Sequence, residues 1–416
     1  MVRAARQCKD DAQRVHFRSM FGVLISLVMS QAAGTSRNPA AAPMSMLMFQ
    51  NGQWSFMLHG QAFLNHTNAS GARGGEKTFS TNWVMATASR PLGRGAIAFR
   101  TMLSLEPATI TQRSYPELFQ TGETAFGKQL IDGQHPHDFF MELAAEYLRP
   151  VGRGSVYVYV APAGDPAFGP VAFPHRASAA ELPQAPLTHH QLDSTHISYN
   201  VITAGAVFDP VTIEASAFHG HEPDERRWDL EGGKIDSWSS RLRLQPTVNL
   251  DLQVSTAHLT HPELVEPGYQ NRTSASISYT RGRWSSTAAW GRVYKEVHDR
   301  DLDGYLAESV VKFFSRHYLT ARAEVAEKDE LFPHPILTVV PRPPQPIRVF
   351  RVKAYTIGYT IDVARPAYGQ IGLGANATRY QYPALLNGFY GEHPHTVIVY
   401  LRGRLGSAMS HHHEMM

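Results

Sequence analysis

The sequence predicts an all-β fold: a transmembrane, antiparallel, up-and-down β-barrel of about sixteen strands. Three observations predict it. Polar and apolar residues alternate with period two along many segments, as in strands with two different faces. The connections between these segments alternate between long and short. After the N-terminal region, no apolar run reaches the roughly eighteen residues needed for a membrane-spanning helix.

Composition narrows the class further. The 416 residues are 43% hydrophobic and 18% charged, and the charged share lies below the ~25% of soluble domains. The net charge of +3 is too small to indicate nucleic acid as a partner. The only cysteine, Cys8, lies in a segment that we expect to be removed. The mature chain would therefore have no disulfide scaffold and no cysteine-based site.

The N-terminus has the features of an export signal. Several basic residues precede the apolar run Phe21–Met29, and Ser30-Gln31-Ala32 offers a cleavage site with small residues. We expect residues 1–32 to be a signal peptide, and Met20 is an alternative start. Residues 33–53 are then a short periplasmic segment, residues 54–405 the barrel, and residues 406–416 a flexible tail. The predicted location is the bacterial outer membrane.

Sixteen segments have strand character. In 96–105, Ile97 and Phe99 alternate with Ala98 and Arg100. Residues 138–148 also suit a helix begun by Asp138, but the hairpin pattern around them favours a strand. The predicted strands are 54–65, 80–90, 96–107, 139–149, 155–161, 195–207, 211–219, 235–245, 249–258, 271–281, 283–292, 304–314, 317–327, 348–362, 368–380 and 395–405.

The connections predict which end of the barrel is which. Short turns rich in Pro and Gly suit the periplasmic side, and longer loops suit the outer side. The predicted long loops are 66–79, 108–138, 162–194, 220–234, 259–270, 293–303, 328–347 and 381–394. Aromatic residues near strand ends suit interfacial girdles, although β-propensity alone also explains them. They are Trp54, Trp83, Tyr147, Tyr157, Tyr279, Trp290, Tyr355, Tyr359 and Tyr400.

A barrel of this size encloses a lumen wide enough for water, lined by the polar strand faces. The basic residues among them outnumber the acidic ones, which favours anion passage. The equally weighted alternative is that cross-strand Arg–Glu pairs only make the lumen rigid. The predicted lumen residues are Arg100, Glu142, Glu146, Arg241, Arg243, Glu308, Lys312, Arg322, Glu324, Arg351, Lys353, Arg402 and Arg404.

Histidines gather near the outer loops. Three His-x-His pairs (135/137, 219/221 and 393/395) would project two imidazoles to the same side of an extended chain. With nearby carboxylates, such nitrogen and oxygen donors suit Zn or Cu. Solvated polar loops and capping groups are the alternative explanation. The candidate ligands are His135, His137, Asp138, His189, His190, His196, His219, His221 and Glu222.

Hydrolase chemistry is a further alternative. Asp193, Ser194 and His196 stand together, but catalytic triads are assembled in space rather than by adjacency. The sequence also has no Gly-x-Ser-x-Gly elbow. We therefore expect no enzyme.

Several motifs between residues 120 and 225 resemble those of a set of uncharacterised bacterial outer-membrane β-barrel proteins. The resemblance implies an outer-membrane location but no agreed activity, so it assigns no residue roles. The final strand departs from the usual barrel pattern, because a Met/His tail follows Leu405. The motifs are 121–127 (TGETAFG), 132–138 (DGQHPHD) with 140–144, 169–173, 193–196 and 221–225.

The leading functional hypothesis is a porin-like channel for small polar or ionic solutes. Its partners would be outer-membrane lipid and small solutes, and the sequence leaves a homo-oligomer open. The alternatives are capture of a transition metal by the histidine-rich outer loops and a membrane-embedded hydrolase.

Overall fold

A computed structural model describes residues 30–333 and 348–409 of the chain. Most of the predicted signal peptide, with Cys8, lies outside the described residues, as do residues 410–416 of the predicted tail and most of the 328–347 loop. No helix within the described ranges is long and apolar enough to cross a membrane.

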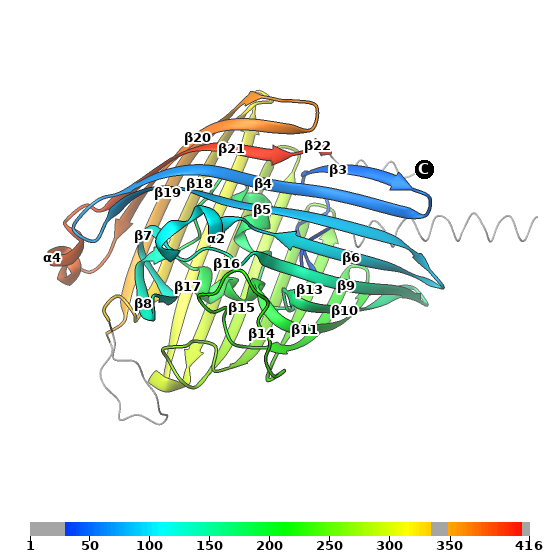
Figure 1. Ribbon diagram of the computed structural model, residues 1–416, viewed down its shortest axis with the longest axis horizontal. Helices are drawn as coiled ribbons and strands as arrows, with labels where there is room; N and C mark the ends of the chain where they lie inside the picture. Colours follow the sequence, from blue (N-terminus) through cyan, green and yellow to red (C-terminus); the bar gives the residue numbers. More distant parts are fainter. Residues whose placement is uncertain (1–29, 334–347, 410–416) are drawn as a thin grey trace, which may run out of the picture.

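Sixteen antiparallel strands form a closed barrel, as predicted (Figure 1). Each strand pairs with the next along the chain, and β21 pairs with β4 to close the cylinder. The strands are β4 (Trp54–Ala69), β5 (Gly75–Leu92), β6 (Gly95–Leu103), β9 (Phe140–Val151), β10 (Gly154–Gly164), β11 (Ser198–Phe208), β12 (Val211–His219), β13 (Ser237–Thr247), β14 (Leu250–Thr260), β15 (Tyr269–Arg281), β16 (Trp284–Lys295), β17 (Arg300–Phe313), β18 (His317–Lys328), β19 (Phe350–Ala364), β20 (Gly369–Gln381) and β21 (His395–Leu405).

Each of the sixteen predicted strands overlaps one of these. Residues 138–148 form most of β9, so the strand interpretation is confirmed and the helix alternative is wrong. These residues form a strand rather than a helix because β9 pairs with β6 on one edge and with β10 on the other. This pairing satisfies the backbone groups of β9 within the sheet.

Two predicted loops are shorter than expected. β4 and β5 remain paired as far as Ala69 and Gly75, so the 66–79 loop shrinks to residues 70–74. β16 and β17 likewise extend into the 293–303 loop and pair as far as Lys295 and Arg300. The residues at these strand ends are polar and therefore resemble loop residues, but the sheet continues through them. Both connections still exceed their neighbours in length (296–299 against 282–283 and 314–316), so the predicted alternation of long and short connections is confirmed.

The remaining long loops lie at one end of the barrel and the tight turns at the other. Figure 1 shows the loop end on the left, with β7 (Tyr115–Ala125), β8 (Lys128–Gln134) and α4 (Asn387–Tyr390). The turn end, on the right, holds β3 (Met44–Asn51) and β22 (Ser407–Met409). These two short strands pair with each other, and β3 also extends the β4 edge.

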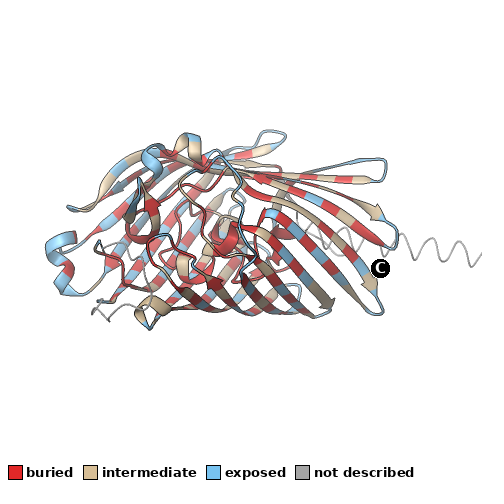
Figure 2. Ribbon diagram, turned by 60° about the horizontal axis from the view of Figure 1, so that its bottom comes forward, coloured by how far each residue is buried: buried red, intermediate tan, exposed pale blue. Residues whose placement is uncertain are grey.

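Alternation along the strands sorts the side chains into two faces, visible as exposed and buried bands in Figure 2. On β6, Phe99 is exposed and Arg100 is buried, and on β18, Leu319 is exposed while Arg322 is buried. Apolar side chains thus cover the outside and charged ones point inward, the reverse of a soluble domain.

Two long connections fold into the barrel. The first inward loop (residues 104–139) contains α2 (Glu106–Thr109), η1 (Thr111–Arg113) and the β7–β8 hairpin. The second inward loop (residues 165–197) contains η2 (Phe173–His175), η3 (Ala177–Ala179), α3 (His189–Leu192) and η4 (Ser194–His196). Shorter turns lie at η5 (Glu296–His298) and η6 (Ala384–Leu386), and β1 (Gln31–Ala33) pairs with β2 (Ser36–Arg37).

Candidate functional site in the barrel interior

Charged pairs line the inner wall. The register sets Glu214 beside Arg241 and Glu308 beside Arg322, and both pairs form buried ion pairs of 2.8 and 2.9 Å. Arg100 contacts Glu142 at 3.0 Å across β6 and β9. Such buried pairs need further hydrogen bonds to offset their desolvation. Segments inside the barrel supply these bonds.

Two of the thirteen predicted lumen residues do not face the lumen. The other eleven lie on the inner wall or line its cavity: Arg100, Glu142, Glu146, Arg241, Arg243, Glu308, Lys312, Arg322, Glu324, Arg402 and Arg404.

The prediction is wrong for Arg351 and Lys353, which lie on the outer face of β19. There Arg351 donates a hydrogen bond to Glu327 at 2.7 Å. The inward positions belong to Val352 and Ala354, which pack in an apolar cluster with Leu118 of the first inward loop. Apolar residues at this end of the strand face a loop inside the barrel rather than lipid, so the expected alternation is reversed.

The girdle assignment of the aromatic residues is also wrong in part. Tyr157 and Tyr400 are buried and point inward, where their hydroxyls donate to a Glu214 carboxylate oxygen and to the Glu181 carbonyl. Trp83 lines the interior cavity and packs against the His175 ring at 4.3 Å.

The N-terminal segment (residues 31–37) lies inside the barrel, in contrast to the periplasmic position predicted for residues 33–53, whereas residues 44–51 form β3 at the turn end. Arg100 donates to the Gly34 carbonyl at 2.6 Å, and Arg241 donates to the Thr35 hydroxyl at 2.9 Å. Arg243 donates to the Arg37 carbonyl at 3.1 Å. The arginines of the wall therefore hold a length of chain instead of facing open water.

The second inward loop crosses the lumen and is held by the same wall charges. Arg176 contacts Glu308 at 2.5 Å and Asp193 at 3.1 Å. Glu181 pairs with Arg402 on β21, and the Thr188 hydroxyl donates to Glu324 on β18 at 3.1 Å. The loop is thus tied to β17, β18 and β21.

Sequence reasoning missed Arg176 and Glu181 as site residues. Together with Asp165 they are the charged residues of an otherwise apolar and Pro-rich stretch, 164–187. An isolated charge in an apolar loop is a signal for a buried ion pair, and that signal was available.

The first inward loop carries two of the motifs that resemble the outer-membrane set, 121–127 and 132–138. Glu123 pairs with His135 at 2.7 Å, and Asp138 pairs with Arg227 at 3.1 Å. The His190 ring lies against Gly122, where a Cβ would come within 2.3 Å of His190 Cε1. These motif residues join the first inward loop to the second and to the 220–236 connection.

The predicted metal ligands are only partly brought together. His137, His189 and His196 surround Phe173, with ring centroids 5.2 Å apart for His137–His196 and 5.3 Å for His189–His196. Carboxylates of the protein already occupy one nitrogen of two of these rings. His137 Nδ1 lies 3.0 Å from a Glu106 oxygen, and His189 Nδ1 lies 2.7 Å from an Asp193 oxygen.

Burial and the neighbouring His137 and His189 lower the pKa of His196 well below its usual value, so this ring is neutral. Burial alone would also lower the pKa of His137, but the Glu106 carboxylate outweighs it and raises that pKa. The three rings therefore form a packed junction between the two inward loops.

The other predicted ligands lie near one another at most in pairs, such as His219 and His221 with ring centroids 6.2 Å apart. His219 lies 3.5 Å from Asp236, His190 lies 3.9 Å from Glu222, and His221 bonds to the Glu222 carbonyl. Within residues 30–333 and 348–409, two groups bring three donor atoms within 4.8 Å of one another: Glu266–His298–Asp329 and Glu263–Glu266–Glu330. Neither contains a predicted ligand, and Lys295 contacts Glu266 at 2.8 Å in their midst.

The hydrolase residues are not arranged as a triad. The Ser194 hydroxyl accepts a hydrogen bond from Arg272 at 2.6 Å and donates to Glu222 at 3.4 Å. Asp193 engages His189 and Arg176 instead. Ser194 thus belongs to an ion-pair network between the second inward loop and the wall.

The space inside the barrel is divided unequally. A cavity of about 840 Å³ opens at the turn end, and we call it the turn-end cavity. Towards the loop end, the interior formed by residues 30–333 and 348–409 contains small voids of about 20 and 30 Å³. The two inward loops and the N-terminal segment therefore close the outer part of the lumen in this conformation.

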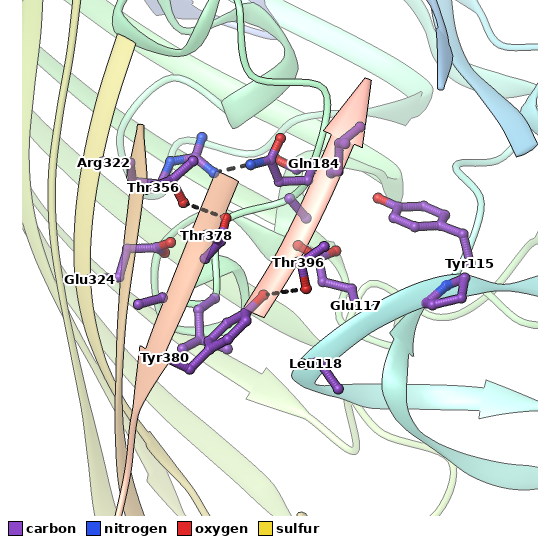
Figure 3. Close-up of a pocket in the computed structure, with 15 residues that line it drawn as sticks. Tyr115, Glu117, Leu118, Gln184, Arg322, Glu324, Thr356, Thr378, Tyr380 and Thr396 are labelled. Atoms are coloured by element: carbon purple, nitrogen blue, oxygen red, sulfur yellow. Dashed lines mark hydrogen bonds between the residues drawn. The ribbon is translucent and has the colours of Figure 1, made fainter. Parts of the chain in front are cut away.

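Figure 3 shows the 20 Å³ void, where the β7 hairpin meets β18, β20 and β21. Glu117 and Glu324 both face it, and one Glu117 oxygen has no hydrogen-bond partner. Burial and the nearby Glu324 charge raise the pKa of Glu117 to about 8, despite Arg322 and Lys328 close by. Glu117 is therefore a protonated acid at neutral pH.

Comparisons with known proteins identify the fold. No protein-family model matches the chain, and no curated protein matches its sequence. Among solved structures it is similar to an anion-selective porin from Comamonas acidovorans (11% identity, TM-score 0.54, covering 84% of this chain and 99% of that one). It is also similar to Salmonella typhi OmpF in complex with daunomycin (8%, 0.51, 86% and 100%) and to the outer-membrane channel DcaP of Acinetobacter baumannii (8%, 0.51, 87% and 100%). The chain has the fold of outer-membrane porins.

Proposed function

We propose that the chain is a porin-like outer-membrane channel for small polar or ionic solutes. The observation that carries the proposal is the closed barrel with an apolar outside, a charged inside and a water-accessible cavity of about 840 Å³. Only a closed sheet satisfies its backbone groups in lipid. The porin fold of the neighbours supports the same proposal.

The second inward loop is the constriction of this channel. It crosses the barrel between the turn-end cavity and the loop end, and its contacts with Glu308, Glu324 and Arg402 hold it there. Solutes pass when this loop moves away from the wall.

Planar-bilayer recordings on the purified protein test the proposal. We expect conductance steps that are smaller than those of an unobstructed barrel of this size, because the lumen is narrowed. If neither the wild type nor a variant with a released second inward loop conducts above the lipid background, the channel proposal is overturned.

We also propose that the chain belongs to the outer-membrane set that its motifs resemble. The support is that motif residues join the interior segments: Gly122 lies against His190 of the second inward loop, and Glu123 and Asp138 pair with Arg227 of the 220–236 connection. Transition-metal capture and an N-terminal export signal stay predictions. Calorimetry with Zn and Cu on the wild type and on a His135/His137/His219/His221 alanine variant decides the first.

A further inference from the structure

The turn-end cavity has an unbalanced charge. Six basic side chains line it and one acidic side chain, Glu181, does so. The basic residues are Arg37, Arg176, Arg283, Lys312, Arg365 and Arg404. A solute that fills the cavity therefore meets a strongly positive wall.

Three of these cations are already neutralised by ion pairs. Arg176 is paired with Glu308 and Asp193, Arg404 with Glu181 at 3.0 Å, and Arg365 with Asp362 at 2.9 Å. Arg37, Arg283 and Lys312 have no carboxylate within 4 Å among residues 30–333 and 348–409. Half of the cavity's cations therefore lack a counter-ion.

Arg37 is the most informative of the three. Its side chain is only 9% exposed, it lines the cavity, and its Nε has no hydrogen-bond partner in the described structure. A guanidinium buried without an acceptor is costly, and planar oxyanions are its preferred partners. Burial and the adjacent Arg243 charge lower the pKa of Arg37, and the more distant Glu146 and Glu214 carboxylates only partly offset this.

Lys312 faces the same space from β17. Its ammonium lies 5.0 Å from the centre of the Tyr318 ring, which also stacks with Arg402 at 5.2 Å. The Asp362 carboxylate attracts the Lys312 charge, but three cations, Arg365, Arg404 and Arg402, repel it. The wall around Lys312 therefore also favours a negative ligand.

We infer that the turn-end cavity is a binding site for small organic anions that carry two or more carboxylate or phosphate groups, held by Arg37, Lys312 and Arg283. This inference rests on the proposed channel function for the route by which the anion arrives. The volume of about 840 Å³ lies within the range of 300–1,000 Å³ that is typical of small-molecule sites. Three unpaired cations match a ligand with two or three negative charges.

Calorimetric titration of the purified full-length protein with citrate and with fructose 1,6-bisphosphate tests the site. We expect saturable binding of at least one of them, and the two arms distinguish carboxylate from phosphate recognition. Arg37→Gln and Lys312→Gln should each weaken binding by about tenfold, the usual cost of one charge-assisted hydrogen bond. Arg37→Lys should recover part of the loss. No saturation with either probe, or unchanged affinity in Arg37→Gln, overturns the inference.

Arg351→Gln is the matched control, because it removes the same charge from the outer face of β19. Its affinity should stay within twofold of wild type, and an equal loss in this variant would mean that net charge alone controls binding. Arg37→Gln should fold, since the Arg37 backbone rather than its side chain holds Arg243.

Conductance separates this inference from the proposed function. A protein that binds citrate but never conducts retains the site and refutes the channel. A protein that conducts without saturable binding retains the channel and refutes the site.

Discussion

The outer part of the lumen and the turn-end cavity are built from the same wall but differ in how their charges are satisfied. In the outer part, Gln184 and Thr188 of the second inward loop bond to Arg322 and Glu324 of the wall, and little space remains. In the turn-end cavity, Arg37 and Lys312 have no carboxylate partner and the space is large. The difference teaches that the wall arginines alone do not define a pore. The lumen closes where the second inward loop fills the space between the walls, and a cavity for an anion remains where Arg37 and Lys312 keep no carboxylate partner.

The largest expected effect comes from breaking the closed part. Glu308→Ala leaves Arg176 and Arg322 buried without their shared carboxylate. Removing one partner of a buried ion pair destabilises the folded structure by about 3–5 kcal/mol. We expect the second inward loop to detach and the single-channel conductance to rise several-fold. Glu327→Ala is the control, because its partner Arg351 is exposed and such surface pairs contribute about 0–1 kcal/mol. Equal conductance in both variants contradicts the assignment of the constriction.

A smaller effect should follow from Gly122→Ala at the junction of the two inward loops. Gly122 has φ +108°, and an added Cβ would come within 2.3 Å of His190. Such backbone strain costs about 1–3 kcal/mol. We expect faster hydrogen exchange in residues 115–134 and 186–196, measured by mass spectrometry. Gly232→Ala is the control, because nothing lies within 4 Å of the added atom, and it should leave that exchange unchanged. If Gly122→Ala exchanges as slowly as the wild type in these segments, the junction of the two loops is not tight.

The smallest effect is a pH dependence of the β7–β8 hairpin. The Glu117 pKa of about 8 lies above its usual value, so the docked state holds a proton that the undocked state loses at lower pH. The stability of docking therefore falls as pH rises from about 4.5 to 8, and stays reduced above 8. Hydrogen exchange of residues 115–134, corrected for its intrinsic pH dependence, should report the loosening. Glu117→Gln should remove this pH dependence, and a persisting slope in that variant would assign it to another group.

The fold was largely predictable because its signals are local. Period-two alternation on β6, β13 and β18 follows from one oily and one polar face, and tight turns such as Gly93-Arg94 and Gly152-Arg153 carry their own sequence marks. All sixteen strands follow from these two signals. Errors arose at 66–79 and 293–303, where strands continue beyond their alternating stretch, because polar residues there do not distinguish strand from loop.

The interior was less predictable because its contacts are not local. Glu181 pairs with Arg402 across 221 positions of the chain, and no periodicity marks such a pair. The prediction placed Arg100, Arg241 and Arg322 on the wall, yet it could not tell that Gly34, Thr35 and Gln184 would accept their hydrogen bonds. Arg351 and Lys353 were misplaced for the same reason, since the apolar partner of Val352 comes from a distant loop.

The most direct test of the account is a paired recording of single-channel conductance in planar bilayers for the wild type and for Glu308→Ala. The account predicts small conductance steps for the wild type and steps several-fold larger for the variant, because a loop tied to Glu308 narrows a water-filled barrel. Bilayers that stay silent with both proteins, although the barrels are folded and inserted, would contradict it.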